Sequence, residues 1–237
     1  MRSGQQTRRE IDAIFTFSGA GNGLCCMAVQ YGFGYGFNSS SYKLCCAQGT
    51  MPGHRVLFID NDYQHYDHAK HLEVVALFRP KYATALDIER SGQVDRVLQQ
   101  AEELAQYAER IIVIPKIDCL AEIPERFVLG YSVPTSYGAT DLDITVFGKR
   151  PVHLLGGSWR QQRALLREMN VVSLDFNHAH KIARSGLYTD LNGYEYRLRD
   201  TLPGFNHRPY VMSMMLSFAA IRSGIDHATN HARSNGR

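Results

Sequence analysis

RVLFIDNDYQHYDHAKHLEVVALFRPKYATALD, residues 55–87, contains a strand, a helix and a second strand in succession. The runs at 55–60 and 82–87 are short and apolar and are followed by polar residues, which is typical of buried strands. Residues 65–78, between them, are long enough to form a helix. Because two strands joined through a helix pair in parallel, this unit predicts a parallel sheet that is covered by helices.

The same alternation continues on both sides of residues 55–87. Further strands are expected at 13–17, 110–115, 127–133, 152–155 and 171–175, and further helices at 94–108, 159–169 and 210–221. The helix at 94–108 is the clearest, because its apolar residues recur along one stripe at helical spacing. The number of strand units favours a closed barrel over a small open sheet. The sequence therefore predicts an α/β fold, a (β/α)8 TIM-type barrel, complete or trimmed.

The chain shows no linker, repeat or low-complexity tract that would divide it. Residues 1–237 are therefore expected to form a single barrel domain. The stretch from Gly32 to Gly53 is rich in Gly, Ser and Tyr and is expected to be an irregular insertion. A C-terminal helix is expected around residues 210–230.

The composition is that of an ordinary globular protein, since 44% of the 237 residues are hydrophobic and 21% are charged. No apolar run reaches the roughly 18 residues that a membrane span needs, and the first ten residues, MRSGQQTRRE, lack the apolar core of a signal peptide. The five cysteines are an odd number without a C-x-x-C motif, which favours reduced thiols over disulfides or a thiolate zinc site. These features predict a cytoplasmic protein, and its net charge of +3 permits a nucleic-acid partner.

Three of the expected strands end in an acidic residue, namely Asp60, Asp87 and Asp175. Chemistry in (β/α)8 barrels lies at the carboxyl ends of the strands, so these carboxylates are expected to converge on one rim. Like charges gathered there raise the pKa of at least one of them, as general acid–base catalysis requires. The alternative for Asp175 is structural, because aspartate is a good N-cap for a following helix.

The stretch SLDFNHAHKIARSG, residues 173–186, resembles a segment of the tRNA-guanine transglycosylase superfamily. Asp175 matches the aspartate that ends a strand in that family, and Arg184 and Gly186 match the tail that follows. Four other stretches resemble strands of the family in the same order: VLFIDNDYQ (56–64), YATALDIE (82–89), FVLGYSVP (127–134) and PVHLLGGS (151–158). The closest resemblance is to the DNA-directed, DpdA-like branch of phages and bacteria, which inserts 7-deazaguanine bases into DNA.

The resemblance implies a base exchange at a glycosidic bond, with Asp175 as the nucleophile that forms a covalent sugar intermediate. Asp60 matches the general acid and base, and Asp62 is its rival within the sequence DND. Asp87 matches the acid that reads the edge of the guanine. The expected base-binding set is completed by Gly130, Tyr131, Gly156 and Lys116. Tyr131 would cover a face of the base, although a plain core aromatic is an equally good interpretation of this residue.

The resemblance also implies the partners, which are DNA and a free 7-deazaguanine base such as preQ0, with no cofactor and no metal. The target guanine must leave its stack to reach the pocket, and the phosphates around it need cations. Four side chains on or near the proposed rim are expected to contact the nucleic acid: Lys181, Arg184, Arg160 and Arg163. DNA is expected because the tRNA enzymes carry a C-terminal cysteine/histidine zinc subdomain, for which this chain has no matching cysteines.

Three alternatives stay open on the sequence alone. The first is a tRNA-guanine transglycosylase that acts on RNA. The second is a metal-dependent hydrolase, because (β/α)8 metallohydrolases use an H-x-H motif at a strand end, and the histidines that could ligate a metal are His178, His180, His65, His68 and His71. The third is a barrel that binds DNA without catalysing a reaction.

Overall fold

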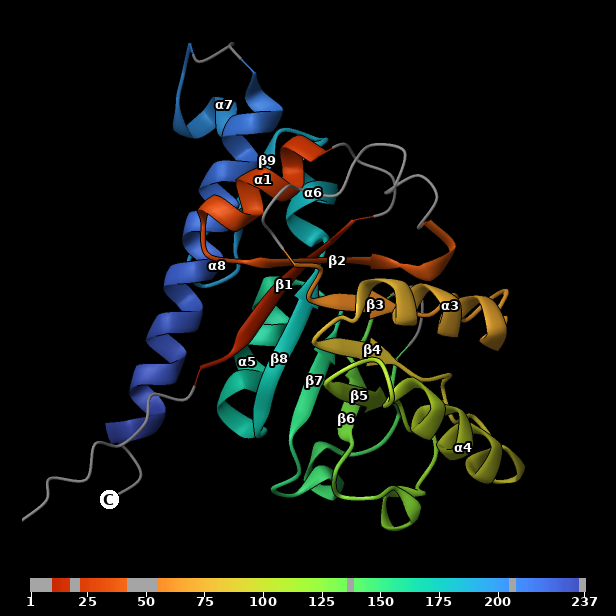
Figure 1. The fold of residues 1–237 in the computed structure, drawn as a ribbon. Coiled ribbons are helices and arrows are strands. Elements are labelled where there is room, and N and C mark those ends of the chain that lie inside the picture. The colour runs from red at the N-terminus through yellow and green to blue at the C-terminus, as the bar shows by residue number, and fades with distance from the viewer. Residues whose placement is uncertain (1–9, 18–21, 42–54, 136–138, 205–207, 235–237) are drawn as a thin grey trace, which may run out of the picture.

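Eight parallel strands close into a barrel in chain order (Figure 1). This computed structural model describes residues 10–17, 22–41, 55–135, 139–204 and 208–234. The strands are β1 (Asp12–Phe17), β2 (Gly34–Asn38), β3 (Phe58–Asp60), β4 (Tyr82–Thr84), β5 (Arg110–Val113), β6 (Val128–Ser132), β7 (Val152–Leu155) and β8 (Val171–Phe176). The pairing of Asp175 with Ile14 joins β8 to β1 and closes the ring. The predicted α/β fold, a (β/α)8 TIM-type barrel, is confirmed.

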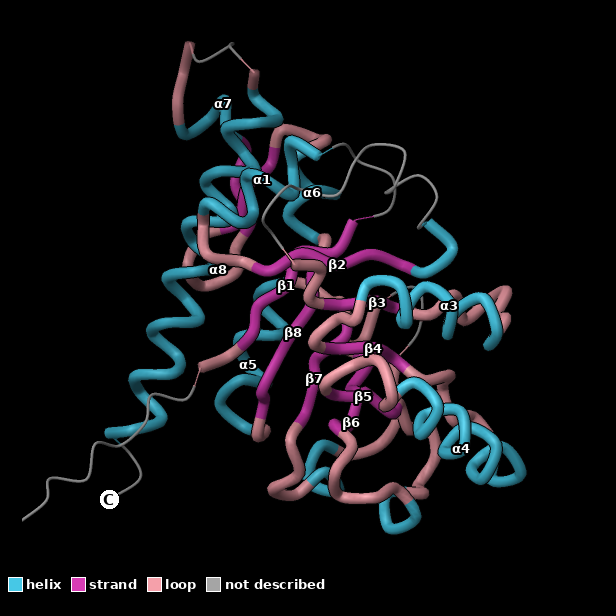
Figure 2. Tube along the Cα trace, viewed as in Figure 1, coloured by secondary structure: helices cyan, strands magenta, loops and turns pink. Residues whose placement is uncertain are grey.

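The helices form an uneven layer around the strands (Figure 2). They are α1 (Asn22–Gln30), α3 (His68–Phe78), α4 (Val94–Leu104), α5 (Trp159–Glu168), α6 (His178–Ala183), α7 (Leu198–Thr201) and α8 (Pro209–Ser234). Among the described residues, the connections from β5 to β6 and from β6 to β7 contain only the short 3-10 helices η3 (Leu120–Glu122) and η4 (Ile144–Phe147). The barrel is therefore complete in its strands and trimmed in its helices.

The strand β2 is the one barrel strand that the sequence did not predict. It lies within the stretch from Gly32 to Gly53, so the expectation of an irregular insertion is wrong for residues 34–38. The glycines explain the error, because glycine in a strand normally weakens it. Here the neighbouring strand is so close that a Cβ atom on Gly36 would lie 2.5 Å from the carbonyl oxygen of Phe58. The short helix η1 (Ser39–Ser41) follows, and residues 42–54 lie outside the described part of the chain.

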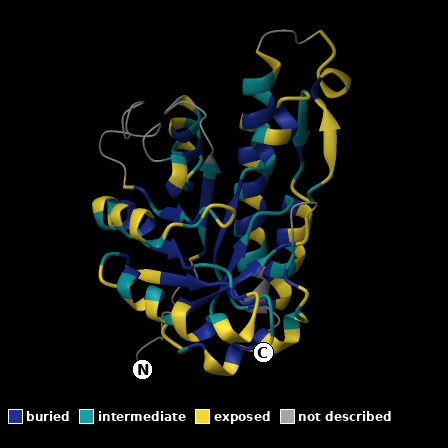
Figure 3. Cartoon of the chain, turned by 90° about the vertical axis from the view of Figure 1, so that its right-hand side faces the viewer, coloured by how far each residue is buried: buried dark blue, intermediate teal, exposed yellow. Residues whose placement is uncertain are grey.

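Two hydrophobic cores follow from the alternation of side chains along the strands. Inside the barrel, one cluster gathers residues from several strands: Ile14, Phe58, Tyr82, Ile112, Ile114 and Val128. The larger cluster lies between the barrel strands and the helices, and the barrel strands are accordingly buried along most of their length (Figure 3). The inner cluster fills the barrel below the carboxyl ends of the strands.

The C-terminal helix α8 packs against α5, α6 and the strand β9 (Leu187–Thr189). Its Phe218 is fully buried, and its ring lies 5.3 Å from that of Phe15 and 5.4 Å from that of Phe33. This aromatic cluster anchors the helix to the barrel beside β1. None of the helices in the described part of the chain is long and apolar enough to cross a membrane.

Some of the sequence expectations fall on residues that the structure does not describe. The polar N-terminal segment 1–9, Cys45 and Cys46 belong to this group. Within the described part, Cys25, Cys26 and Cys119 are thiols that form no disulfide.

Candidate active site

A cavity of about 730 Å³ opens at the carboxyl ends of the barrel strands. Asp60 at the end of β3, Asp87 in the loop after β4 and Asp175 near the end of β8 all line it. Lys116, which follows β5, lines it as well. The prediction that these groups converge on one rim is confirmed, and the reason is that all eight strands point the same way.

Asp175 is held by groups from the two strands on either side of β8. Its Oδ2 accepts a hydrogen bond from the Thr16 hydroxyl at 2.9 Å, and its Oδ1 accepts one from the backbone N–H of Gly156 at 3.0 Å. Asp175 is not the N-cap of α6, since Asn177 occupies that position. Asp175 is only 8% exposed and lines the cavity, and these hydrogen bonds fix the orientation of its carboxylate.

A buried histidine that the sequence analysis missed lies beneath this carboxylate. His153 Nε2 is 3.4 Å from Asp175 Oδ1, while its Nδ1 is 2.7 Å from the hydroxyl oxygen of Ser173. The imidazole stacks on the Phe58 ring at 5.1 Å inside the barrel. The signal was present in the stretch PVHLLGGS, where a histidine interrupts an apolar strand and must find a polar partner when buried.

The backbone around Asp175 is fixed by Gln162 of α5, a second residue that the sequence analysis missed. Its side-chain nitrogen donates to the carbonyl oxygens of Gly156 and Asp175, at 2.7 Å in both cases. Gln162 is fully buried, although it belongs to an otherwise polar stretch of sequence. Its amide therefore ties the ends of β7 and β8 together behind the cavity.

Asp60 has an environment that favours its protonated form. Burial and the nearby charge of Asp175 raise the pKa of Asp60 to about 8, even though Thr84 and the Asn61 N–H donate hydrogen bonds that lower it. The prediction that one strand-end acid has a raised pKa is confirmed. At neutral pH this carboxyl group can act as a proton donor on the cavity wall.

Asp87 and Lys116 form an ion pair across the cavity wall. The Lys116 Nζ is 3.4 Å from Asp87 Oδ2, and it donates a hydrogen bond to the Ser132 hydroxyl at 2.6 Å. Burial raises the pKa of Asp87, and the Lys116 ammonium partly offsets this effect. The Asp87 carboxylate can therefore accept hydrogen bonds from a ligand, and the neighbouring Lys116 ammonium stabilises its negative charge.

The structure places Asp62 and Tyr131 away from the cavity. Asp62 accepts a hydrogen bond from the His65 N–H in a turn, so only Asp60 of the two rivals reaches the site. Tyr131 points to the outside of the barrel, where its ring packs edge-on against Phe147 at 5.5 Å. The prediction that Tyr131 covers a base is therefore wrong, and the core interpretation of this residue is confirmed.

The two predicted glycines also have other roles than binding a base. Gly130 pairs with His153 in the sheet, and a Cβ atom there would lie 2.6 Å from Ile114, so it serves close packing inside the barrel. Gly156 lines the cavity, but its N–H is bonded to Asp175 and its carbonyl oxygen to Gln162. The backbone groups of Gly156 position the carboxylate and leave Asp87 as the predicted reader of the base.

The predicted phosphate-binding residues are spread more widely than expected. Lys181, which is exposed on α6, lines the cavity, whereas Arg160, Arg163 and Arg184 are not part of its wall. The Arg160 guanidinium stacks on the Tyr194 ring, 4.9 Å from its centroid. Only Lys181 is therefore placed to touch a ligand that is bound in the cavity itself.

The histidines of the metal-hydrolase alternative do not converge. His178 Nε2 is 2.7 Å from Glu195 Oε1, and His180 Nδ1 is 2.7 Å from the Tyr210 hydroxyl. His68 and His71 lie on α3, and His65 lies before it in the turn at Asp62. Within the described residues, no group of three metal-binding side chains is found. The positions of these histidines therefore give no support to the alternative of a metal-dependent hydrolase.

The comparisons with known proteins bear on the family of this chain. No match is found among curated proteins. A family model described as "Family of unknown function (DUF6610)" matches residues 28–225, a range that holds Asp60, Asp87 and Asp175 and seven of the eight barrel strands. Because the match covers most of the sequence, the chain belongs to the family DUF6610.

Proposed function

We propose that the protein is a base-exchange transglycosylase, which replaces guanine in DNA by a 7-deazaguanine derivative. The observation that carries the proposal is a pair of carboxyl groups with different surroundings in one cavity. Asp60 has a pKa of about 8 and can hold a proton, whereas Asp175 is held in place by Thr16 and Gly156. A retaining displacement at a glycosidic bond needs one group of each kind.

In the first step, an oxygen of Asp175 attacks the anomeric carbon of the target nucleotide. The bond from that carbon to the guanine nitrogen breaks, and an ester bond to Asp175 forms. The proton of Asp60 passes to the departing guanine, so the base leaves in its neutral form. The neighbouring negative charge of Asp175 is consumed in this step, which lowers the pKa of Asp60 and favours release of its proton.

In the second step, the ionised Asp60 accepts a proton from the ring nitrogen of the incoming 7-deazaguanine base. That nitrogen attacks the anomeric carbon, the ester bond breaks, and Asp175 regains its charge. Asp87, supported by Lys116, would accept hydrogen bonds from the N–H groups of either base. Both bases present the same N–H edge, so one reader serves both steps.

DNA is proposed as the substrate because the sequence resembles the DNA-directed branch. A 7-deazaguanine is proposed as the incoming base because that branch inserts such bases. Lys181 on the cavity wall supports a polyanionic substrate. The position of the cavity at an open barrel rim is compatible with a nucleotide that has been turned out of its helix.

The experiment is incubation of the full chain with labelled guanine and either duplex DNA or unmodified tRNA at equal salt. Label that enters DNA supports the proposal. Label that enters tRNA alone would assign RNA as the substrate and keep the mechanism. Binding of DNA without incorporation of any label would identify a barrel that binds DNA but does not exchange bases, and would overturn the proposal.

A further inference from the structure

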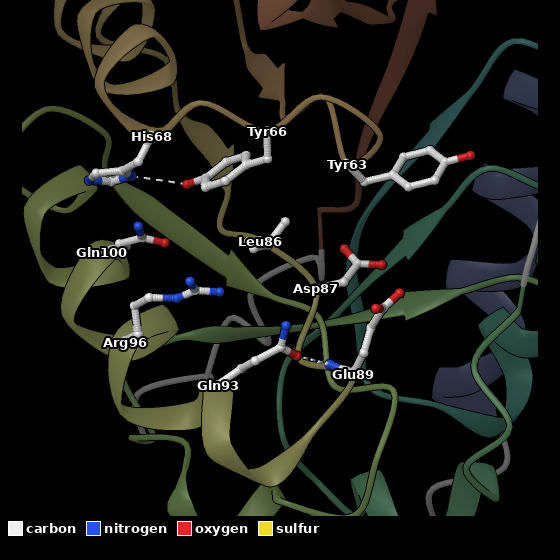
Figure 4. A pocket seen from close by; sticks show the side chains of 9 residues that line it. All are labelled: Tyr63, Tyr66, His68, Leu86, Asp87, Glu89, Gln93, Arg96 and Gln100. Carbon is white, nitrogen blue, oxygen red and sulfur yellow. Dashed lines mark hydrogen bonds between the residues drawn. The ribbon is translucent and has the colours of Figure 1, made fainter.

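A second pocket of about 360 Å³ adjoins the candidate active site. It shares Tyr63, Asp87 and Glu89 with the larger cavity, so the two spaces lie next to each other at these residues. Figure 4 shows these three side chains along one side of the pocket and His68, Gln100 and Arg96 along the other. A ligand that extends from the candidate active site past Asp87 would enter this second pocket.

Two polar groups on the far wall have no strong partner among the residues that the structure describes. The Oε1 atom of Gln100 is buried and accepts no hydrogen bond within the described residues. The Arg96 guanidinium forms no ion pair among the described residues, and Figure 4 shows it extending toward the centre of the pocket. A buried acceptor without a partner is uncommon in proteins, and a ligand that donates a hydrogen bond would satisfy it.

Three other side chains of the pocket, those of Tyr66, His68 and Gln93, are hydrogen-bonded within the protein. The Tyr66 hydroxyl is 3.0 Å from His68 Nδ1, and His68 Nε2 is 2.8 Å from Glu103 Oε2. The Oε1 atom of Gln93 accepts from the N–H groups of Glu89 and Arg90, which holds the loop in front of α4. The pocket therefore has a rigid frame that presents Gln100 and Arg96.

Tyr63 stands at the boundary between the two spaces. Tyr63 belongs to the loop after β3 and is 55% exposed. Figure 4 shows the ring beside Asp87, across the pocket from Arg96. An exposed ring at this place offers a flat face on which a nucleobase can stack.

We propose that this pocket binds the nucleobase next to the target guanine and thereby sets the sequence context of the reaction. This inference rests on the proposed function, since it requires a nucleic acid in the adjoining cavity. The neighbouring base would stack on Tyr63, and its edge would contact the amide of Gln100 and the guanidinium of Arg96. Glutamine and arginine are the side chains that read purine edges through paired hydrogen bonds.

The charges of the pocket favour a base over a phosphate. Asp87 and Glu89 line the same space as Arg96, so an anion would meet two carboxylates for one cation. A neutral base with both donors and acceptors avoids this repulsion and can use either sign of group. The phosphates would then stay outside, where Lys181 marks the rim of the larger cavity.

The test uses the full chain and a set of DNA duplexes in which a guanine is flanked by every combination of neighbouring bases. Exchange of labelled guanine and, separately, binding of each duplex without a free base are measured. The wild-type protein should prefer one neighbour over the others by roughly tenfold, the range of one paired base contact. Gln100→Met and Arg96→Met should each reduce this preference several-fold in both assays. Tyr63→Ala should weaken binding of every duplex, whereas Tyr63→Phe should not.

Gln99→Met is the matched control, because Gln99 lies on the same helix but is exposed and outside the pocket. It should leave the preference unchanged. The inference is overturned if the wild type shows no neighbour preference, or if the preference survives in both Gln100→Met and Arg96→Met. A neighbour preference in binding that depends on Gln100, together with no exchange on any duplex, would uphold the pocket and reject the transglycosylase.

Discussion

The backbone N–H of Gly156 donates a hydrogen bond to the Asp175 carboxylate at 3.0 Å, which joins the loop after β7 to the end of β8. Gly156 has a φ angle of +62°, a conformation that favours glycine. Thr16 of β1 donates to the other oxygen of the same carboxylate. Groups from both neighbouring strands thus hold Asp175, and a carboxylate oriented in this way needs little rearrangement before it reacts.

Replacing Asp175 with asparagine should abolish base exchange while leaving the fold intact, because the amide has the same shape but cannot form the ester intermediate. The wild type should form an adduct with DNA that resists denaturation when no incoming base is present, and Asp175→Asn should not. Gel analysis of denatured complexes measures the adduct, and labelled guanine measures exchange. Asp95→Asn, an exposed acid on α4, is the control and should behave as the wild type. Exchange at the wild-type rate in Asp175→Asn would remove Asp175 from the mechanism.

The raised pKa of Asp60 predicts a dependence of stability on pH. An unfolded chain ionises this group near pH 3.8, whereas the folded protein holds the proton up to about pH 8. The folded state therefore binds more protons between these values, and its stability should fall as the pH rises through this window, by at most about 1.4 kcal/mol per pH unit. Asp60→Asn removes the effect, so the stability of the variant relative to the wild type should grow from pH 5 to pH 9. Denaturant unfolding at several pH values measures this, and parallel curves for the two proteins would contradict it.

The same pKa predicts the pH profile of the first chemical step. Asp60 must carry a proton to assist the departing guanine, so formation of the adduct should slow as the pH rises above about 8. Rapid mixing of enzyme and DNA without free base measures this step alone. Asp60→Asn should form the adduct slowly at every pH. A rate of adduct formation that rises steadily to pH 10 would show that a protonated Asp60 is not needed.

The strands that carry the site were predictable because their signals are local. Apolar runs that end in Asp60, Asp87 and Asp175 identify three strands and their carboxyl ends, and the barrel brings these ends together without further information. The predicted end of the third strand was less accurate: the strand was expected to reach Asp87, but β4 ends three residues earlier. The contribution of the loop to the cavity wall depends on the bridge between Ile88 and Pro115, a contact between distant segments.

The residues that contact and position Asp175 were not predictable, because their roles depend on partners far away in the sequence. Thr16 is 159 positions from Asp175, and His153 looks like an ordinary residue of an apolar strand until Ser173 and Asp175 are placed beside it. Tyr131, in contrast, was expected in the site and lies outside it. A shift of one position along a strand turns a side chain from the inside of the barrel to the outside, and the sequence alone did not fix that choice.

Gly36→Ala should destabilise the barrel, because the added Cβ atom would lie 2.5 Å from the Phe58 carbonyl oxygen in the neighbouring strand. The nearest atom belongs to the backbone, which leaves little room to adjust, so a loss of roughly 1 to 3 kcal/mol in the free energy of unfolding is expected. Gly23→Ala is the matched control, since a Cβ atom there would meet nothing within 4 Å. Thermal unfolding of the two variants measures the difference. Equal stability of Gly36→Ala and the wild type would contradict the close approach of β2 and β3.

Asp87 should bind the free base rather than take part in bond breaking. Asp87→Ala should weaken binding of guanine by about 1 to 3 kcal/mol, or roughly one to two decades in affinity, because the N–H edge of the base loses its acceptor. Since burial raises the pKa of Asp87, binding to the wild type should weaken on acidification at a pH above the usual range of aspartate. Lys116→Met should move this loss to a still higher pH, because the ammonium group that favours the charged form is removed. Calorimetric titration with guanine over a range of pH measures both effects. Unchanged affinity in Asp87→Ala would leave Asp87 as a structural partner of Lys116 and nothing more.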